Sequence, residues 1–529
     1  MRASWLLGSA VAVLRIVCVP VGGGGDGGAV TGSDGGAPPP ASDSGALASD
    51  ADAGPATTGP LDYTGEHDLN CDGYADVAVS EPSHAAPDGT LDGGRVWVYF
   101  GAGGGLDAVP DVEIVDPAFV PGSAAADAFG RALASGGDVD GDGCADLVVG
   151  AAGAPDAGGA AAGAAFLYRG GAGFDALADA TLSCPSATAC GRAVDLSADV
   201  NGDGYHDVLV GASGAALLFL GGPGPTFDAT PDATYTGATT AFGTRVALAP
   251  DVNGDGYDDV LVAAPPASVF VFQGGPAAPF DLTPDAELVS TVPLWTGAPY
   301  EFGLRNFDGD LFGASIAGVG DVTGDGYGDV LVGAPGTDYG TGGLVLTRIE
   351  EVGASYFYAG GPGGLDPTAP VISGGAPTVE WPVESGCEDT TLQVPPGHER
   401  GTAVARAGDV DGDGLADFVV SSPRDSTWTG CFSGSIHVES PVGAWWEIGR
   451  NPGPAFPYVG SFGADVAGVG DVNGDGFDDV AVSIWSWGVA ASEVQVFLGP
   501  PPGYVGVVPA STMLVPAAPG GQFGYAVAH

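Results

Sequence analysis

Basic side chains are scarce in this sequence of 529 residues, and lysine does not occur in it. The 13 basic residues are all arginine and stand against 66 acidic residues, which gives a formal net charge of −53 at neutral pH. Filling seven sites with divalent cations would leave the chain strongly acidic. Such a surface repels phosphate groups, so we expect neither nucleic acid nor an anionic membrane as a partner.

Long hydrophobic runs are also missing. The one apolar stretch near the start, Trp5 to Val19, is interrupted by Arg15 and is too short to span a bilayer. We therefore interpret residues 1–19 as an export signal and expect an extracellular or outer cell-surface protein without a transmembrane segment. Cys18, followed by GGGGDGG, resembles the lipid-attachment site of bacterial lipoproteins. An ordinary signal peptide or a misassigned start are the alternatives.

The next segment, residues 20–61, is rich in Gly, Ala, Ser, Asp and Pro and has too few large apolar side chains to bury a core. It predicts a flexible linker. Residues 62–529 remain as the folded region.

Histidine is limited to six scattered residues, and none forms a recognisable pattern with Ser and Asp. His206 lies in a turn and is expected to be a solvated turn residue. His398, close to Glu399 and Arg400, is the only candidate worth testing for catalysis. We therefore assign no catalytic residue.

Seven cysteines occur, six of them after Cys18. Export permits disulfides. Cys184 and Cys190 are close enough in sequence for a local bridge, and Cys387 with Cys431 could staple an insertion. No partner is assigned to Cys71 or Cys144, and six buried thiols are the alternative.

What the chain has in abundance is one repeated acidic motif. The stretch DVDGDGCADLVVGAAG begins at Asp138, and six further copies begin at Asp68, Asp199, Asp251, Asp321, Asp409 and Asp471. Each copy places oxygen-bearing side chains at positions 1, 3 and 5, a glycine at position 6 and an aspartate at position 9. Carboxylates at alternate positions around a glycine turn form an oxygen cage for a hard cation, and the flexible geometry favours Ca²⁺ over Mg²⁺.

An EF-hand loop would end with a glutamate at position 12 and continue as a helix. Here position 12 of the Asp138 copy is Val149, and a β-branched run follows, which predicts a buried strand. The unit is thus strand, metal loop, strand, with up to seven Ca²⁺ ions in the chain. The predicted metal ligands are the residues at positions 1, 3, 5 and 9: Asp68, Asn70, Asp72, Asp76, Asp138, Asp140, Asp142, Asp146, Asp199, Asn201, Asp203, Asp207, Asp251, Asn253, Asp255, Asp259, Asp321, Thr323, Asp325, Asp329, Asp409, Asp411, Asp413, Asp417, Asp471, Asn473, Asp475 and Asp479.

A second signal begins nine residues before the leading aspartate of six copies, where four copies have a Phe-Gly pair and two keep only the glycine. The pairs are Phe129-Gly130, Cys190-Gly191, Phe242-Gly243, Phe312-Gly313, Arg400-Gly401 and Phe462-Gly463. Downstream, residues 333–335 read Gly-Ala-Pro. In these features residues 62–529 resemble the FG-GAP repeat family, which occurs in the β-propeller of integrin α subunits and in many secreted bacterial proteins.

The resemblance and the repeat count predict an all-β fold, a seven-bladed β-propeller of four-stranded blades. The first copy lacks the Phe-Gly pair, whereas Phe523-Gly524 begins an unfinished repeat at the other end. We therefore expect residues 523–528 to supply the missing strand of the first blade, antiparallel to residues 76–80. The alternative is a truncated eighth repeat.

In such a propeller the metal loops share one face, the bottom, and the long insertions at 288–311, 334–354 and 376–399 share the opposite face, the top. The integrin resemblance implies ligand binding at the top and Ca²⁺ at the bottom. Aromatic and basic side chains on the top loops are the candidate ligand site, although packing of the insertions is the alternative: Trp295, Tyr300, Arg305, Tyr339, Trp381, Trp428, Trp485 and Trp487.

These observations favour a non-catalytic, calcium-stabilised extracellular binding or adhesion module for a glycan or protein ligand. Two alternatives stay open at this point. One is a secreted propeller enzyme acting on polysaccharide, and the other is a purely structural cell-surface protein.

Overall fold

The computed structural model describes most of the repeat region, all of it within one compact unit, Thr58–His529. The regular elements of the described residues are β-strands throughout, as the all-β prediction requires. No described residues form a helix long and apolar enough to cross a membrane. The described residues are 67–82, 93–119, 128–155, 160–184, 188–224, 226–276, 279–292, 303–305, 309–341, 347–349, 352–374, 399–423, 434–439, 445–449, 460–486, 492–500, 510–515 and 523–528.

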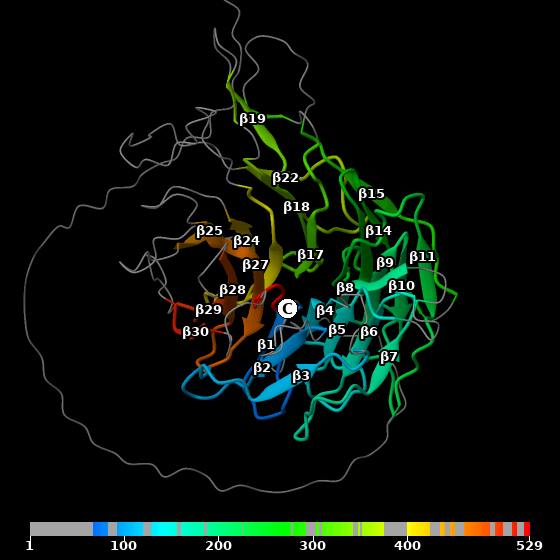
Figure 1. The fold of residues 1–529 in the computed structure, drawn as a ribbon. Helices are drawn as coiled ribbons and strands as arrows, with labels where there is room; N and C mark the ends of the chain where they lie inside the picture. Colours follow the sequence, from blue (N-terminus) through cyan, green and yellow to red (C-terminus); the bar gives the residue numbers. More distant parts are fainter. Residues whose placement is uncertain are drawn as a thin grey trace, which may run out of the picture. The chain divides into compact units, whose positions relative to one another are not determined.

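Seven antiparallel sheets form the blades of the predicted seven-bladed propeller (Figure 1). Six of them consist of consecutive strands, and blade 5 leaves out β19 and β20. The first strands of blades 2 to 7 contact one another from each blade to the next. In order the blades are β1–β3 (Val77–Glu81, Arg95–Tyr99, Val112–Val115); β4–β7 (Phe129–Ser135, Leu147–Ala151, Ala164–Tyr168, Ala180–Leu182); β8–β11 (Thr188–Ala198, Asp207–Ser213, Ala215–Phe219, Ala233–Thr236); β12–β15 (Arg245–Ala249, Asp259–Ala264, Ser268–Phe272, Ala286–Val289); β17, β18, β21 and β22 (Ser315–Gly320, Asp329–Ala334, Ala354–Tyr358, Val371–Gly374); β23–β26 (Val404–Gly408, Asp417–Ser422, Ser435–Glu439, Trp445–Gly449); and β27–β30 (Gly460–Gly470, Asp479–Ser486, Glu493–Phe497, Thr512–Leu514).

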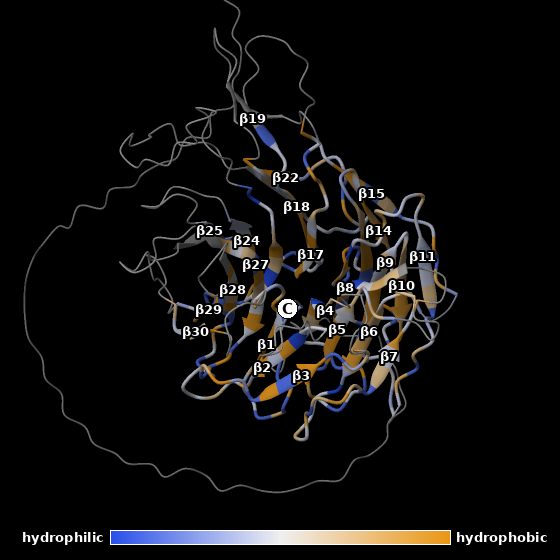
Figure 2. Ribbon diagram, in the orientation of Figure 1, coloured by the Kyte–Doolittle hydropathy of each residue, from blue (hydrophilic) through white to orange (hydrophobic). Residues whose placement is uncertain are grey.

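The second strand of each blade is buried on both faces. In blade 2 this is β5, LVVGA, in which all five residues are buried. A strand that packs against neighbouring blades on both sides needs apolar residues at every position, which is why these strands read as continuous β-branched runs. In the outer strands, buried and exposed residues alternate instead. β3 and β15 each bury one residue between two exposed neighbours. Figure 2 shows the same change from apolar inner strands to mixed outer ones.

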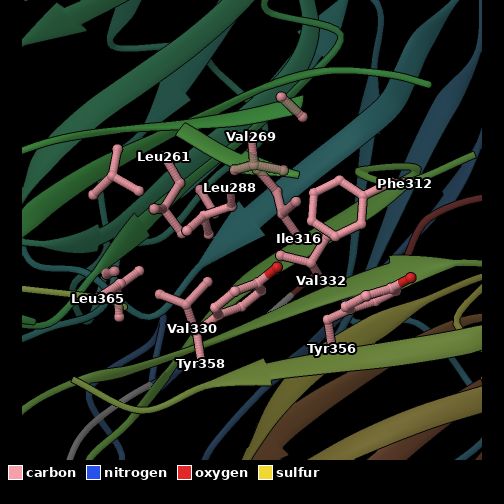
Figure 3. Close-up of a cluster of buried hydrophobic side chains, with 14 of the residues drawn as sticks. Leu261, Val269, Leu288, Phe312, Ile316, Val330, Val332, Tyr356, Tyr358 and Leu365 are labelled. Carbon is pink, nitrogen blue, oxygen red and sulfur yellow. The ribbon is translucent and has the colours of Figure 1, made fainter. Parts of the chain in front are cut away.

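Seven clusters of buried apolar side chains hold the blades together, one at each interface between neighbours. In the interface shown in Figure 3, Leu261 and Leu288 of blade 4 belong to one cluster with Val330 and Tyr356 of blade 5. Phe312, from the Phe-Gly pair of blade 5, packs edge-on against Tyr356 at 4.9 Å between ring centroids. Burial between blades, rather than within one sheet, is therefore the main source of stability.

The glycine of each Phe-Gly pair forms a tight joint with the preceding blade. Gly243 has φ of +78°, and a Cβ there would lie 2.0 Å from the carbonyl oxygen of Ala215 in blade 3. Gly401 has φ of +82° and meets the Ala354 carbonyl of blade 5 in the same way. Both the backbone angle and the close approach require glycine. This explains why the glycine is kept in blades 3 and 6, where the phenylalanine is replaced by Cys190 or Arg400.

An eighth, three-stranded sheet joins two insertions that belong to different blades. It consists of β16 (Gly303–Arg305), β19 (Asp338–Thr341) and β20 (Thr347–Ile349). β16 lies in the insertion before blade 5, and β19 and β20 lie in the connection after β18. Both connections leave the strand ends opposite to the metal loops. We call this structure the top sheet.

The ring is closed by the C-terminal residues, as predicted. Val527 forms an antiparallel bridge with Val79 of β1. Ser80 donates its amide to the Ala526 carbonyl at 3.0 Å, and Ala528 donates to the Ala78 carbonyl at 3.1 Å. Phe523 and Val527 are buried in the cluster between blades 7 and 1. The predicted strand over residues 523–528 was too long, because the observed pairing is a single bridge with flanking hydrogen bonds.

Replacing Phe523 by alanine should destabilise the protein by about 3–5 kcal/mol, because the ring is fully buried and belongs to the segment that closes the propeller. The control is Met513→Ala on the outer strand β30, where the side chain is 43% exposed; a change within about 0.5 kcal/mol is expected there. Urea unfolding of both variants measures the difference. Equal stability of the two variants would show that the closing segment contributes nothing.

Candidate metal centres

Six of the seven acidic motifs connect the first and second strands of their blades. The motif of blade 1 precedes β1, which corresponds to the second strand of the other blades. Position 9 of each loop stands at the start of the second strand, as Asp207 does in β9 and Asp259 in β13. All seven connections lie at the same end of the strands, which is the predicted bottom face. We number the loops 1 to 7 by blade.

The aspartate at position 1 organises each loop by accepting backbone hydrogen bonds. In loop 4, Asp251 Oδ1 accepts from the amides of Gly254 and Asp255 at 2.6 and 3.0 Å, and Oδ2 accepts from Gly256 at 2.7 Å. The bond from the position-6 amide recurs in all seven loops. These bonds curl the chain so that the side chains at positions 3 and 5 point inward with position 1.

The aspartate at position 9 connects the loop to the rest of its blade. Asp146 Oδ2 accepts from the Val139 amide at 2.7 Å, and Oδ1 accepts from the Gly170 amide at 2.7 Å. The first bond comes from position 2 of the loop and occurs in all seven blades. The second comes from the turn after the third strand and is present in six blades in the described part of the chain.

Burial raises the pKa of these position-9 carboxyls far above the usual range for aspartate. The pKa rises to about 7 for Asp146 and to about 8 for Asp76 and Asp479. Backbone hydrogen bonds oppose this rise, and the neighbouring loop carboxylates add to it by like-charge repulsion. Ionisation of these carboxyls is therefore unfavourable in the fold without a cation, and a cation bound beside them would stabilise the ionised form.

Loops 2 and 6, which carry aspartate at position 3, each bring three carboxylates together. One oxygen from each of Asp138, Asp140 and Asp146 lies within 4.8 Å of the others, and the same holds for Asp409, Asp411 and Asp413. Asp140 Oδ1 is buried, and no donor among the described residues reaches it. An unpaired buried carboxylate oxygen beside two further carboxylates fits a divalent cation, whose ligands would be these oxygens.

In loops 1, 3, 4 and 7 an asparagine stands at position 3. Its side-chain oxygen accepts from the position-5 amide, and its NH₂ group donates to the position-5 carboxylate, as in Asn253 with Asp255 at 2.8 and 2.9 Å. Loop 5 has Thr323 there, whose amide donates to Asp329 at 3.0 Å. These loops carry one carboxylate fewer than loops 2 and 6, yet they keep the same backbone path.

Neighbouring loops are joined directly. The amide at position 8 donates to the position-1 carbonyl of the preceding loop, as His206 does to Asp138 at 2.9 Å. The imidazole Nδ1 of His206 also accepts from the Asp138 amide at 3.1 Å. The expectation that His206 is a solvated turn residue was therefore wrong. Asp258 and Asp478, also at position 8, accept from the position-1 amides of their preceding loops in the same manner.

Two disulfides are present among the described cysteines. The predicted Cys184–Cys190 bridge is confirmed. The second bridge, Cys71–Cys144, was not anticipated, because the partners lie 73 residues apart in two different metal loops. Cys387 and Cys431, predicted to pair, lie outside the described residues.

The structure places only part of the predicted ligand site. Leu304 of β16 pairs with Tyr339 of β19, next to the pair Arg305–Asp338, so the backbones of Arg305 and Tyr339 come together in the top sheet. Trp485 lies in β28, where it pairs with Ser461. The remaining candidates and the catalytic candidate lie outside the described residues: Trp295, Tyr300, Trp381, Trp428, Trp487 and His398.

Two models of known repeat families match this part of the chain. The FG-GAP repeat model covers residues 129–168, 312–346 and 400–438, and the FG-GAP-like repeat model covers residues 199–262. Integrin alpha-IIb of Mus musculus is 34% identical over 176 residues, which are 29% of this chain and 15% of that protein. Integrin alpha-4 of Xenopus laevis is 27% identical over 231 residues, 38% of this chain and 21% of that protein.

The matched segments are thus a minor part of the length of these relatives. The FG-GAP matches at residues 129–168, 312–346 and 400–438 begin at the pairs Phe129-Gly130, Phe312-Gly313 and Arg400-Gly401. The chain contains repeats of the FG-GAP type, and its propeller is similar in sequence to segments of integrin α subunits.

Proposed function

We propose that this chain is a non-catalytic, calcium-stabilised extracellular module that binds a glycan or protein ligand through its top face. The observation that carries the proposal is the difference between the two ends of the propeller. The bottom holds seven acidic loops of one design. The top holds connections of very different length, two of which combine into the top sheet. Variable loops on a rigid frame are the usual place for recognition.

The bottom loops support calcium as the stabilising ion, one per loop at most. Ca²⁺ takes oxygen ligands in flexible geometry, and the loops supply side-chain oxygens at positions 1, 3, 5 and 9 together with a position-7 carbonyl. When bound, the ion would neutralise carboxylates that otherwise repel one another by about 4 kcal/mol per pair at 4 Å and a surface-like dielectric.

Two arguments support an exported protein. Both disulfides in the described region require an oxidising compartment. The relatives that match are integrin α subunits by name. The proposal includes residues 1–19 as the export signal, residues 20–61 as the linker and Cys18 as a possible lipid anchor.

The ligand site that we propose includes Arg305 and Tyr339 of the top sheet and the predicted aromatic residues of the other top loops. To test it, the full chain should be applied to an array of neutral and acidic glycans in the presence of Ca²⁺. We expect Arg305→Ala and Tyr339→Ala to weaken binding at least tenfold, about 1.4 kcal/mol. Met513→Ala on the rim is the matched control. If the ligand still binds equally well after both top-sheet substitutions, the ligand site does not include Arg305 or Tyr339.

Removal of calcium should lower the melting temperature by more than about 10 °C, because several loops lose their cation together. Calorimetry with and without EDTA measures this. Mg²⁺ should restore much less than Ca²⁺, because Mg²⁺ demands a tight octahedral site. A melting temperature that EDTA leaves unchanged would contradict the calcium proposal.

The metal-free protein should also have an unusual pH profile. Its position-9 carboxyls have pKa values raised in the fold, to about 7 for Asp207 and about 8 for Asp417, above about 4 in the unfolded chain. Their stabilising contribution is complete below the unfolded value and is lost as pH rises through the folded values. In EDTA the protein should therefore melt higher at pH 5 than at pH 8. With Ca²⁺ the order should reverse, because the ion binds the ionised form.

Loop 2 should bind calcium more weakly than loop 6, although both carry four aspartates. Arg169 donates to Asp140 Oδ2 at 2.7 Å and so places a guanidinium beside one of the cation's ligands. The substitution Arg169→Gln should raise the calcium affinity of loop 2 about three- to tenfold, because one competing positive charge is removed. Calcium-dependent hydrogen exchange of residues 138–146 reports the change, with residues 409–417 as the internal reference. Unchanged or weaker binding in loop 2 would contradict it.

A further inference from the structure

Positions 4 and 7 of the metal loops carry no predicted side-chain ligand, yet they meet across every interface between blades. Tyr205, at position 7 of loop 3, lies over Gly141, at position 4 of loop 2: a Cβ on the glycine would be 2.6 Å from the ring carbon Cε1. Tyr257 lies over Gly202 in the same way, at 2.9 Å. The ring of one residue fills the space that the missing side chain of the other leaves open.

This contact repeats around the whole ring, including the closure from loop 7 to loop 1. Position 4 is glycine at six of the seven junctions, and position 7 there is tyrosine, phenylalanine or leucine. The pairs are Gly141–Tyr205, Gly202–Tyr257, Gly254–Tyr327, Gly324–Leu415, Gly412–Phe477 and Gly474–Tyr74.

The seventh junction, between loops 1 and 2, contains the disulfide Cys71–Cys144. Cys71 is position 4 of loop 1 and Cys144 is position 7 of loop 2, so the bridge occupies the place of the glycine–aromatic contact. The backbone of Cys71 has φ of +61°, in the same left-handed region as Gly202 at +70°. A non-glycine residue held there shows that the loop path is maintained at some conformational cost. The disulfide is therefore the covalent form of a contact that is otherwise made by packing.

The peptide group that follows position 7 adds a second link at the same place. Its N–H belongs to position 8 and donates to the position-1 carbonyl of the preceding loop: Asp258 to Asp199 at 3.2 Å, and Gly328 to Asp251 at 2.9 Å. Its C=O belongs to position 7, whose carbonyl is a ligand in calcium loops of this spacing. Because a trans peptide is planar, its C=O and N–H point in opposite directions. One rigid peptide group therefore directs its C=O to the cation site of its own loop and its N–H to the preceding loop.

We propose that the contact between position 7 of one loop and position 4 of the preceding loop couples their cation sites. Filling a loop fixes its position-7 residue, and this residue holds the preceding loop in the shape that binds the next cation. At the junction of loops 1 and 2 the disulfide makes this coupling permanent. The inference rests on the proposed calcium binding and adds residues that touch no cation with their side chains.

The first test examines the geometry without any metal. If the junctions are equivalent, the double substitution Gly202→Cys/Tyr257→Cys should form a disulfide during oxidative expression, as Cys71 and Cys144 do. Mass spectrometry of proteolytic peptides from the full chain detects the cross-link. The matched control is Gly204→Cys/Tyr257→Cys, because a Cβ at Gly204 meets no atom within 4 Å. Equal cross-linking in the control, or none in the first variant, would overturn the equivalence of the junctions.

The second test examines coupling by hydrogen exchange during a Ca²⁺ titration, with each loop followed separately. Tyr257→Ala should raise the calcium midpoint of loop 3, residues 199–207, at least fivefold, a coupling of ordinary size, although every ligand of loop 3 is intact. Tyr257→Leu should preserve most of the coupling, because Leu415 occupies this position at the next junction but one. Loop 6, residues 409–417, should not shift.

The outcomes separate the coupling from the calcium proposal. If Ca²⁺ protects the loops of the unaltered protein but Tyr257→Ala leaves the midpoint of loop 3 unchanged, the coupling is wrong and calcium binding stands. If Ca²⁺ protects no loop in the unaltered protein, both proposals are overturned. A third variant, Cys71→Gly/Cys144→Tyr, restores the glycine–tyrosine pair. It should keep the calcium midpoints of loops 1 and 2 each within about threefold of its value in the unaltered protein, and a larger change would contradict the equivalence.

Discussion

The structure depends on one buried carboxylate in each blade, the aspartate at position 9 of the metal loop. It accepts one hydrogen bond from the start of the loop and, in six blades of the described region, another from the turn after the third strand. A single side chain thereby connects the start of the loop, the start of the second strand and the turn after the third strand. Burying an ionisable group is costly unless it is bonded and its charge balanced. The raised pKa of Asp146 and Asp479 shows that the backbone amides balance it only in part. Each of these carboxyls must therefore either stay protonated or have a positive charge beside it, and all of them lie at the bottom face.

The two ends of each interface are held by different chemistry. At the top, the Phe-Gly pair brings two backbones together, which only a glycine such as Gly243 allows. At the bottom, hydrogen bonds and side-chain contacts link loop to loop, with the apolar cluster lying between the two ends. Because both ends are fixed by short-range contacts, the connections beyond the Phe-Gly joint can vary in length without disturbing the blades. The top sheet is the outcome of this freedom, since two insertions from different blades pair there.

Much of this could be predicted from the sequence, because the signals were local and repeated. The loop spacing, the buried second strands and the Phe-Gly pairs each follow from a motif of a few residues. The closing role of Phe523 followed from an incomplete repeat at either end of the propeller. The features that sequence reasoning missed depend on contacts between repeats. Cys71 and Cys144 occupy positions that look like spacers within one loop, and their pairing becomes visible only when position 4 is compared with position 7 of the next loop. The role of His206 was hidden for the same reason, because its hydrogen-bond partner lies in the neighbouring blade. The pairing in the top sheet depends on insertions that follow no repeat.

The contact between positions 7 and 4 also gives the ring a direction. Each blade uses one side of its loop to reach the blade before it and a different side to receive the blade after it, so the interface is heterologous, as in a ring of identical subunits. A head-to-tail contact of this kind does not by itself fix the number of blades in the ring. The disulfide breaks this uniformity at one junction, and the bridge between Val79 and Val527 closes the ring in the same blade. Blade 1 is therefore the one unit whose order in the circle is chemically marked, and a repeat gained or lost elsewhere in the ring would leave both of its special joints intact.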